Sequence, residues 1–170
     1  MDIQVQIEMI GRVAIAVILG GIVGLEREIQ RKPAGLRTHM LVTGAAALLA
    51  CLGETLIAKY ALVATPMEVI RADPTRIIQS IILGIGFIGA GTIMHTQQEQ
   101  RVKNLTTAGS ILFVSGIGIA SALREYVLAG GITLMLLVVN SAVGAVEKRY
   151  ARKRKKSKKN GGAEEEPESE

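Results

Sequence analysis

The sequence predicts an all-α fold, namely a polytopic membrane bundle of about five transmembrane helices followed by a disordered, charged C-terminal tail. Hydrophobic residues make up 49% of the 170 residues, and the mean hydropathy is +0.35 although the C-terminal end is highly charged. The charged residues are gathered in a few places, with long uncharged runs between them. These runs lack the polar face that a helix of a soluble bundle shows. A membrane bundle therefore fits the sequence better than a soluble one.

The five expected spans follow from the length of the apolar runs. A helix needs about 20 mostly apolar residues to cross the hydrocarbon core of a bilayer. Three runs without Asp, Glu, Lys or Arg have this length, at residues 77–98, 104–123 and 126–146. Two further candidates are weaker. The first, at 13–25, is too short unless it extends toward the N-terminus, which would place Glu8 and Arg12 near an interface. The second, at about 36–60, contains Glu54 and Lys59.

The distribution of basic residues predicts the orientation and the domain division. With the N-terminus outside, the segments on the inner side carry 15 Lys and Arg residues and those on the outer side carry five. Because basic residues favour the cytoplasmic side, this count predicts an outside N-terminus and a cytoplasmic C-terminus. We expect a transmembrane domain at 1–147 and a disordered cytoplasmic tail at 148–170, with nine basic residues followed by five Glu. The basic half should attract anionic lipid rather than nucleic acid.

Polar residues near the ends of the expected spans are the material for an ion or transport site. The inner group contains Glu26, Arg27, Arg37, Thr38, Asn104, Thr106 and Thr107, and the outer group contains Asp73 and Arg76. A carboxylate within a bilayer is costly and usually pairs or lines a wet cavity, so we expect Glu26 to pair with Arg37. Simple anchoring at the interface is the alternative. Asp73 and Asn104 have a second interpretation as helix N-caps.

Glycines predict close helix packing. Gly20 and Gly24 form a GxxxG pair in the first expected span, which is a weak signal for contact within the bundle or for dimerisation. In the third span, Gly84 and Gly91 share one helix face, and Gly86 and Gly89 share the opposite face. A helix with small residues on two faces can touch partners on both sides, so we expect this helix to be central.

The sequence contains no assembled catalytic set, and we expect neither an enzyme nor a cofactor. Cys51 is the only cysteine, which excludes an internal disulfide and a cysteine-based metal cluster. His39 and His95 are isolated, without the spacing of helical metal ligands. The residues give no basis for assigning a metal ligand set.

Three stretches of the chain, in order, resemble the MgtC/SapB family of bacterial inner-membrane proteins. They are GLEREIQRKPAGLRTHMLVTGAAAL at 24–48, DPTRIIQSIILGIGFIGAGTI at 73–93 and VKNLTTAGSILFVSGIGIA at 102–120. The resemblance implies a small polytopic bundle in the inner (plasma) membrane with an outside N-terminus. It also implies a link to magnesium limitation and membrane potential, and a membrane-protein partner such as the ATP synthase.

The chain departs from the family in two places. Better-known members carry a cytoplasmic ACT-like domain after the last helix, so the chain resembles a short form without that domain. The family usually has Arg-Gly-Leu-Thr-Thr before its fourth helix, where this chain has Lys103-Asn104-Leu105-Thr106-Thr107. By resemblance, motif positions are occupied by Glu26, Arg27, Gly35, Leu36, Arg37, Thr38, Asp73, Arg76, Gly86, Gly89, Gly91, Thr106 and Thr107.

Two functional hypotheses follow, with a third of lower rank. The first is a non-enzymatic regulator linked to magnesium and membrane-potential homeostasis, which acts through helix contacts with membrane partners. The second is a small ion transporter or channel, for instance for Mg²⁺, which works as a homodimer because five short helices enclose little aqueous volume. The third is a lipid-binding scaffold organised by the basic tail.

Overall fold

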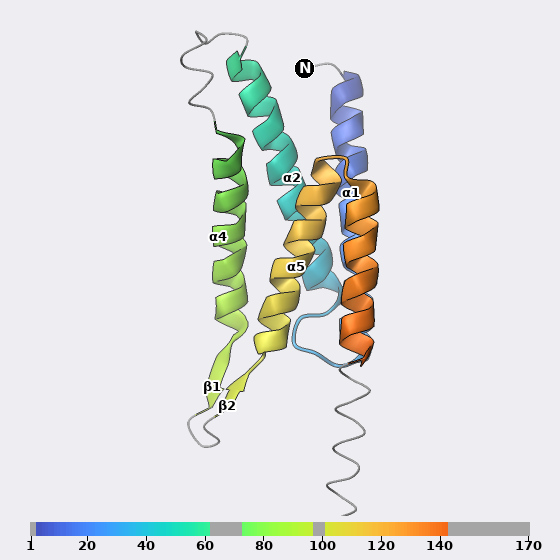
Figure 1. The fold of residues 1–170 in the computed structure, drawn as a ribbon, viewed down its shortest axis with the longest axis vertical. Coiled ribbons are helices and arrows are strands. Elements are labelled where there is room, and N and C mark those ends of the chain that lie inside the picture. Colours follow the sequence, from blue (N-terminus) through green and yellow to red (C-terminus); the bar gives the residue numbers. More distant parts are fainter. Residues whose placement is uncertain (1–2, 62–72, 97–100, 143–170) are drawn as a thin grey trace, which may run out of the picture. The chain divides into compact units, whose positions relative to one another are not determined.

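The computed structural model describes residues 3–61, 73–96 and 101–142, and these residues are mainly helical (Figure 1). The long helices are α1 (Ile3–Ile29), α2 (Leu36–Ala61), α4 (Pro74–Thr92) and α5 (Leu105–Ala122), and all four are long and apolar enough to cross a membrane. A shorter apolar helix follows at Tyr126–Ala142. The chain divides into two compact units, Met1–Leu136 and Leu137–Glu170. Residues 137–142 are the described part of the second unit, and the predicted tail at 148–170 lies outside the described residues.

The N-terminus of α4 is capped as the sequence predicts. Asp73 has an extended backbone and accepts hydrogen bonds from the Thr75 amide at 2.9 Å and from the Thr75 hydroxyl at 2.7 Å. Pro74 occupies the first helical position, where its missing N–H has no helical acceptor to lose. These contacts hold the pKa of the Asp73 carboxyl below its usual range, because the hydroxyl and the amide of Thr75 both donate to the ionised form. The cap therefore depends on an ionised Asp73.

Helices α1 and α5 end in the same turn, with an arginine in the left-handed conformation. After α1, the Arg31 amide donates to the Glu28 carbonyl, and the Lys32 amide donates to the Arg27 carbonyl. After α5, the Arg124 amide donates to the Ser121 carbonyl, and the Glu125 amide donates to the Ala120 carbonyl. Both patterns are Schellman motifs. The φ angle is 56° at Arg31 and 65° at Arg124, a region that favours glycine. Each arginine is thus held in a strained backbone position.

The third expected span is shorter in the structure than in the prediction. Helix α4 ends at Thr92 instead of continuing through the uncharged run to residue 98. The chain then forms β1 (Met94–Thr96), which pairs antiparallel with β2 (Arg101–Lys103) and leads into α5 (Figure 1). An uncharged run is as compatible with a hairpin as with a helix end, so the charge count could not separate them. Apart from this hairpin, the regular secondary structure of the described residues is helical.

The centre of the first unit is α5, and the expectation that the third span is central is wrong. Eleven of the 18 residues of α5 are buried, and this helix contacts α1, α2 and α4. Helix α4 buries Ile81, Ile85 and Gly89 out of 19 residues, and all three lie on one face. Its small residues therefore do not mark two contact faces within this unit. The core instead joins α5 to α1 and α2 through Val23, Val42, Ala46, Ile111, Val114 and Ile117.

Close approach of the helices is set by glycines that lack room for a side chain. A Cβ atom on Gly20 would lie 2.8 Å from the carbonyl oxygen of His39, and one on Gly24 would lie 2.8 Å from Cα of Leu36. The predicted GxxxG pair therefore packs α1 against α2 within the chain. Gly118, which the sequence analysis did not single out, brings α5 against α2, since its Cβ would lie 2.3 Å from the carbonyl oxygen of Thr43.

Candidate functional site

A buried arginine organises the ionisable groups at the end of the bundle where α1 begins and α2 ends. Arg12 on α1 is 3% exposed and forms ion pairs with Glu8 at 2.9 Å and with Glu54 at 2.8 Å. Its guanidinium also donates to the carbonyl oxygen of Ala122, at the end of α5, at 3.0 Å. Arg124 completes the group through a 2.8 Å contact between its Nε and the Glu8 carboxylate. We call these four ionisable residues, Glu8, Arg12, Glu54 and Arg124, the Arg12 cluster.

The elements of the fold place each member of the Arg12 cluster. Glu8 and Arg12 are four residues apart on α1, so they lie on the same helix face. Glu54 lies near the C-terminal end of α2, which antiparallel packing brings beside the first turns of α1. Arg124 is placed by the left-handed turn after α5. The Arg12 cluster therefore connects three helices.

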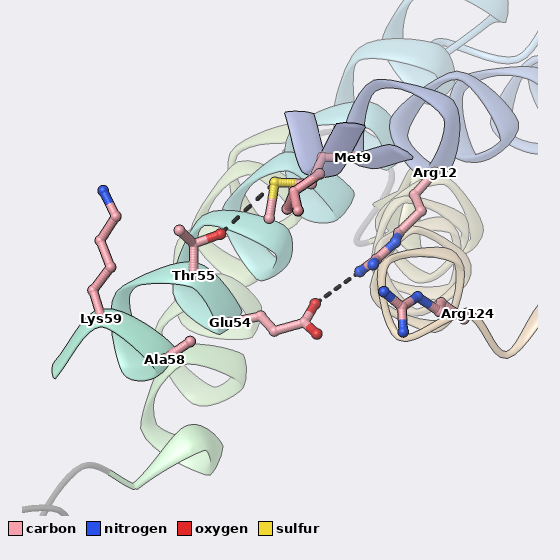
Figure 2. A pocket seen from close by; sticks show the side chains of 8 residues that line it. Met9, Arg12, Glu54, Thr55, Ala58, Lys59 and Arg124 are labelled. Atoms are coloured by element: carbon pink, nitrogen blue, oxygen red, sulfur yellow. Dashed lines mark hydrogen bonds and ion pairs between the residues drawn. The ribbon is translucent and has the colours of Figure 1, made fainter. Parts of the chain in front are cut away.

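A pocket of about 390 Å³ opens beside the Arg12 cluster. Figure 2 shows its lining, in which Met9 and Ala58 provide an apolar wall and Thr55 provides a hydroxyl. The Glu54 carboxylate points toward Arg124, and the Lys59 side chain at the other edge points away from both. The dashed lines mark the Arg12–Glu54 ion pair and the contact from the Thr55 hydroxyl to the Met9 sulfur. The pocket thus combines an apolar side with charged groups of both signs.

A second group of buried polar residues lies nearer the other end of these helices. Arg27 on α1 is 1% exposed and donates to the Thr107 hydroxyl at 3.1 Å. The Ser110 hydroxyl donates to the Thr107 carbonyl at 2.8 Å and lies 3.2 Å from Nε2 of His39. His39 is fully buried, and its Nδ1 donates to the Gly35 carbonyl at 2.9 Å, because that oxygen can only accept. We call Arg27, His39, Thr107 and Ser110 the His39 cluster.

The structure brings together two of the predicted inner residues, Arg27 and Thr107. Glu26 accepts a hydrogen bond from the side chain of Gln30, one turn further along α1. Arg37 is exposed, and its pairing with Glu26 stays a prediction.

The remaining predicted residues are spread over the bundle. Thr106, Asp73 and Arg76 are exposed, and Thr38 is partly buried. Gly84, Gly86 and Gly91 have no atom within 4 Å of an added Cβ, and Gly89 makes ordinary contact with Ala108 of α5.

Asn104 takes the N-cap position of α5 but does not cap it with its side chain. Its φ is 69°, and its side-chain amide donates instead to the Thr92 carbonyl at the end of α4, at 3.1 Å. Asparagine is the non-glycine residue that best tolerates this left-handed conformation. This explains how asparagine can stand where the resemblance expects glycine, and the side chain adds a bond that glycine could not make.

Sequence reasoning missed most of the buried polar residues. The sequence analysis places Arg12 near a membrane interface and finds no partner at metal-ligand spacing for His39. In the structure both side chains are buried and hydrogen-bonded. The available signal was the i, i+4 spacing of Glu8 and Arg12, which predicts a pair on a helix. No group of three or more His, Cys, Asp or Glu residues that could hold a metal ion occurs in the part of the chain that the structure describes.

Comparison with known proteins identifies the family. The chain matches the MgtC family over residues 13–149. It is 33% identical to an uncharacterized protein of Haemophilus influenzae over 84% of this chain and 58% of the relative. It is 34% identical to the putative magnesium transporter YhiD of Escherichia coli K12 over 77% of this chain and 59% of the relative. It is also 33% identical to protein MgtC of Salmonella typhimurium strain 14028s over 74% of this chain and 48% of the relative.

The chain spans about half to three fifths of the length of these relatives. No solved structure matches it. The family match covers four fifths of the residues, and the helices that it includes are long and apolar enough to make a multi-pass membrane protein. The chain therefore belongs to the MgtC family.

Proposed function

We propose that this protein is a non-enzymatic membrane regulator linked to magnesium homeostasis, which acts through contacts between its helices and another membrane protein. The link to magnesium rests on the family and on a relative that is named a putative magnesium transporter. The mode of action rests on α4, the helix that the rest of the unit covers least.

The observation that carries the proposal is the open face of α4. Leu83 is 78% exposed and Phe87 is 82% exposed, whereas Ile81 and Ile85 on the opposite side are buried. Gly84 and Gly86 lie beside these exposed side chains and leave space for another backbone. Lipid tails are as apolar as the helices, so helices in a membrane associate through close packing and interhelical hydrogen bonds, and small residues permit both. Helix α4 is therefore suited to bind a partner helix.

The Arg12 cluster supports a regulator over a magnesium pathway. Mg²⁺ prefers oxygen ligands and gives up its waters reluctantly, so a pathway needs carboxylates that are free to receive it. The charges of Glu8 and Glu54 are compensated by Arg12, which donates to both, and Arg124 binds Glu8 as well, so neither is an unpaired anion for a bare divalent cation. These carboxylates stabilise the ends of three helices, which is a structural role.

The proposal is tested by photo-crosslinking in cells grown in low magnesium, with a benzophenone amino acid at Phe87 or at Ile85. We expect an adduct with one defined membrane protein from the exposed Phe87 position and none from the buried Ile85 position. Gly86→Leu should remove that adduct and the complementation of growth in low magnesium. Gly109→Leu is the matched control, because Gly109 on α5 is equally open. Unchanged adducts and growth with Gly86→Leu would contradict the proposal.

A transporter is the second candidate, and the His39 cluster favours it. Polar side chains buried between membrane helices are costly and often lie along ion or proton pathways. Flux of Mg²⁺, Na⁺, K⁺ and H⁺ in proteoliposomes tests this candidate, beside Arg27→Gln and the exposed control Arg37→Gln. Flux that Arg27→Gln abolishes and Arg37→Gln preserves would favour a transporter. Absence of flux from folded, inserted protein would exclude these four ions as cargo.

A further inference from the structure

We infer that the pocket beside the Arg12 cluster binds the headgroup of an anionic glycerophospholipid, with the phosphate held by Arg124, a headgroup hydroxyl held by Glu54, and Lys59 as a further cation at the rim. This site is distinct from the open face of α4, and it does not depend on the proposed regulatory function. The inference rests on the pocket's position, its charged groups and the placement of Arg124 in its lining.

The position of the pocket corresponds to the headgroup region of a bilayer. Its lining comes from the first turns of α1, beginning at Val5, and from the last turns of α2, where the apolar span ends at Lys59. Ile10 and Leu56, on the same turns of these two helices, are 68% and 64% exposed, so acyl chains can lie against the helices. A volume of about 390 Å³ lies within the range of small-molecule sites.

The charged groups of the pocket carry a small excess of positive charge. Lys59 and Arg124 both line the pocket, and Arg124 contacts Glu8 through its Nε. The Arg12 cluster together with Lys59 carries one more positive than negative charge. Guanidinium and ammonium groups are the side chains that bind phosphate most strongly. An anionic ligand therefore suits the pocket better than a cationic one.

Glu54 defines the headgroup further. Its Oε2 accepts from Arg12, while its side chain remains 51% exposed. Figure 2 shows the Glu54 carboxylate directed toward Arg12 and Arg124, whereas the Lys59 ammonium points away from them, so a ligand that meets Arg124 also lies beside the carboxylate. A carboxylate repels phosphate but accepts a hydrogen bond from a hydroxyl. A phosphodiester with a hydroxylated glycerol headgroup satisfies both requirements.

The backbone turn after α5 places the Arg124 side chain at the pocket. Arg124 takes the left-handed position that ends the helix, with φ of 65°, and its side chain is one of the cations that line the pocket. Arg31 has the same conformation after α1 and does not line the pocket, so the turn explains the placement of Arg124 and not its ligand.

The test uses the full chain in phosphatidylcholine vesicles that contain a phosphatidylglycerol probe with a diazirine near the glycerol end of one acyl chain. After irradiation, the labelled residues are mapped by peptide mass spectrometry, which separates the pocket from the basic tail. We expect labels concentrated at residues 5–12 and 54–59, removed by unlabelled phosphatidylglycerol and not by added phosphatidylcholine. Labelling spread evenly over all helix ends, or removed equally by phosphatidylcholine, would overturn the inference.

Variants and a competitor distinguish the ligand's source from the pocket's chemistry. Lys59→Gln with Arg124→Gln should reduce labelling about tenfold, whereas the exposed Arg76→Gln, which does not line the pocket, should not. Ala58→Phe fills the pocket without changing charge and should act like the double variant if that variant does not fold. Removal of the label by inorganic phosphate as efficient as that by phosphatidylglycerol would assign the site to free phosphate and overturn the lipid. Labelling that survives both pocket variants would overturn the site itself.

Discussion

Replacing Gly118 with alanine should destabilise the bundle, whereas the same change at Gly116, two residues earlier on α5, should not. An added Cβ at Gly118 would lie 2.3 Å from the Thr43 carbonyl oxygen and 3.2 Å from the Ala47 amide nitrogen. Both atoms belong to the α2 backbone, so they cannot rotate away as a side chain could. An added Cβ at Gly116 meets nothing within 4 Å. The pair therefore separates the cost of crowding from the effect of alanine on the helix.

The magnitude follows from two opposing effects. Overpacking a well-packed contact costs about 1–3 kcal/mol, and alanine favours a helix over glycine by about 1 kcal/mol. Both variants gain the helix propensity of alanine, so that gain cancels between them, and only Gly118→Ala carries the crowding cost. Their free energies of unfolding should therefore differ by roughly 1–3 kcal/mol. In a chain of this length, each kcal/mol shifts the melting temperature by about 2–4 °C. Gly118→Ala should therefore melt roughly 2–12 °C below Gly116→Ala.

Cys51 provides the assay. It is the only cysteine in the sequence, is 1% exposed, and packs with Ala47 in the small core between α1, α2 and α5. A fluorogenic thiol reagent should react with it only when the bundle opens, so reaction during a thermal ramp in detergent reports the melting temperature of each variant. A melting temperature of Gly118→Ala equal to or above that of Gly116→Ala would refute the close packing of α5 on α2.

Three further predictions concern the charged ends of the helices. Arg124→Gly should be more stable than Arg124→Ala by about 1 kcal/mol in the thiol-reactivity assay, because both lose the same ion pair and only glycine relieves the left-handed backbone; equal stability would contradict this strain. Arg12→Leu should lower the free energy of unfolding by about 2 kcal/mol. Adding Glu54→Gln to Arg12→Leu should lower it further by less than Glu54→Gln does in the wild-type chain, because the charge of Glu54 has then lost its partner. Additive effects in this double-mutant cycle would exclude coupling between the two residues. The pKa of Asp73 is lowered in the folded protein, so its capping contribution is complete above the usual value of 3.8 and is lost as the pH falls through the lower folded pKa. Amide exchange at Thr75 should therefore rise at acid pH relative to neighbouring amides, and Asp73→Asn, which caps without ionising, should remove that difference.

The sequence by itself determined the spanning helices and one helix start, because both depend on neighbours along the chain. Apolar length predicts a spanning helix, and each of the four long helices overlaps an expected span, although α1 and α4 begin earlier than predicted. The Asp73-Pro74 cap is equally local, since its partner is two residues away. The end of the third span could not be predicted in this way, because the hairpin between β1 and β2 continues an uncharged run.

Only the tertiary structure decided which polar residues meet and which helix is central. Arg12 binds Glu54 and the Ala122 carbonyl across 42 and 110 residues of sequence, and Arg27 reaches Thr107 across 80. Small residues on α4 looked like two contact faces, but the backbone approach occurs at Gly118 of α5. In a membrane most helix surfaces are apolar, so hydropathy cannot mark the inward face. The contacts are chosen by shape and by the need to pair buried polar groups, and both depend on residues far apart in the chain.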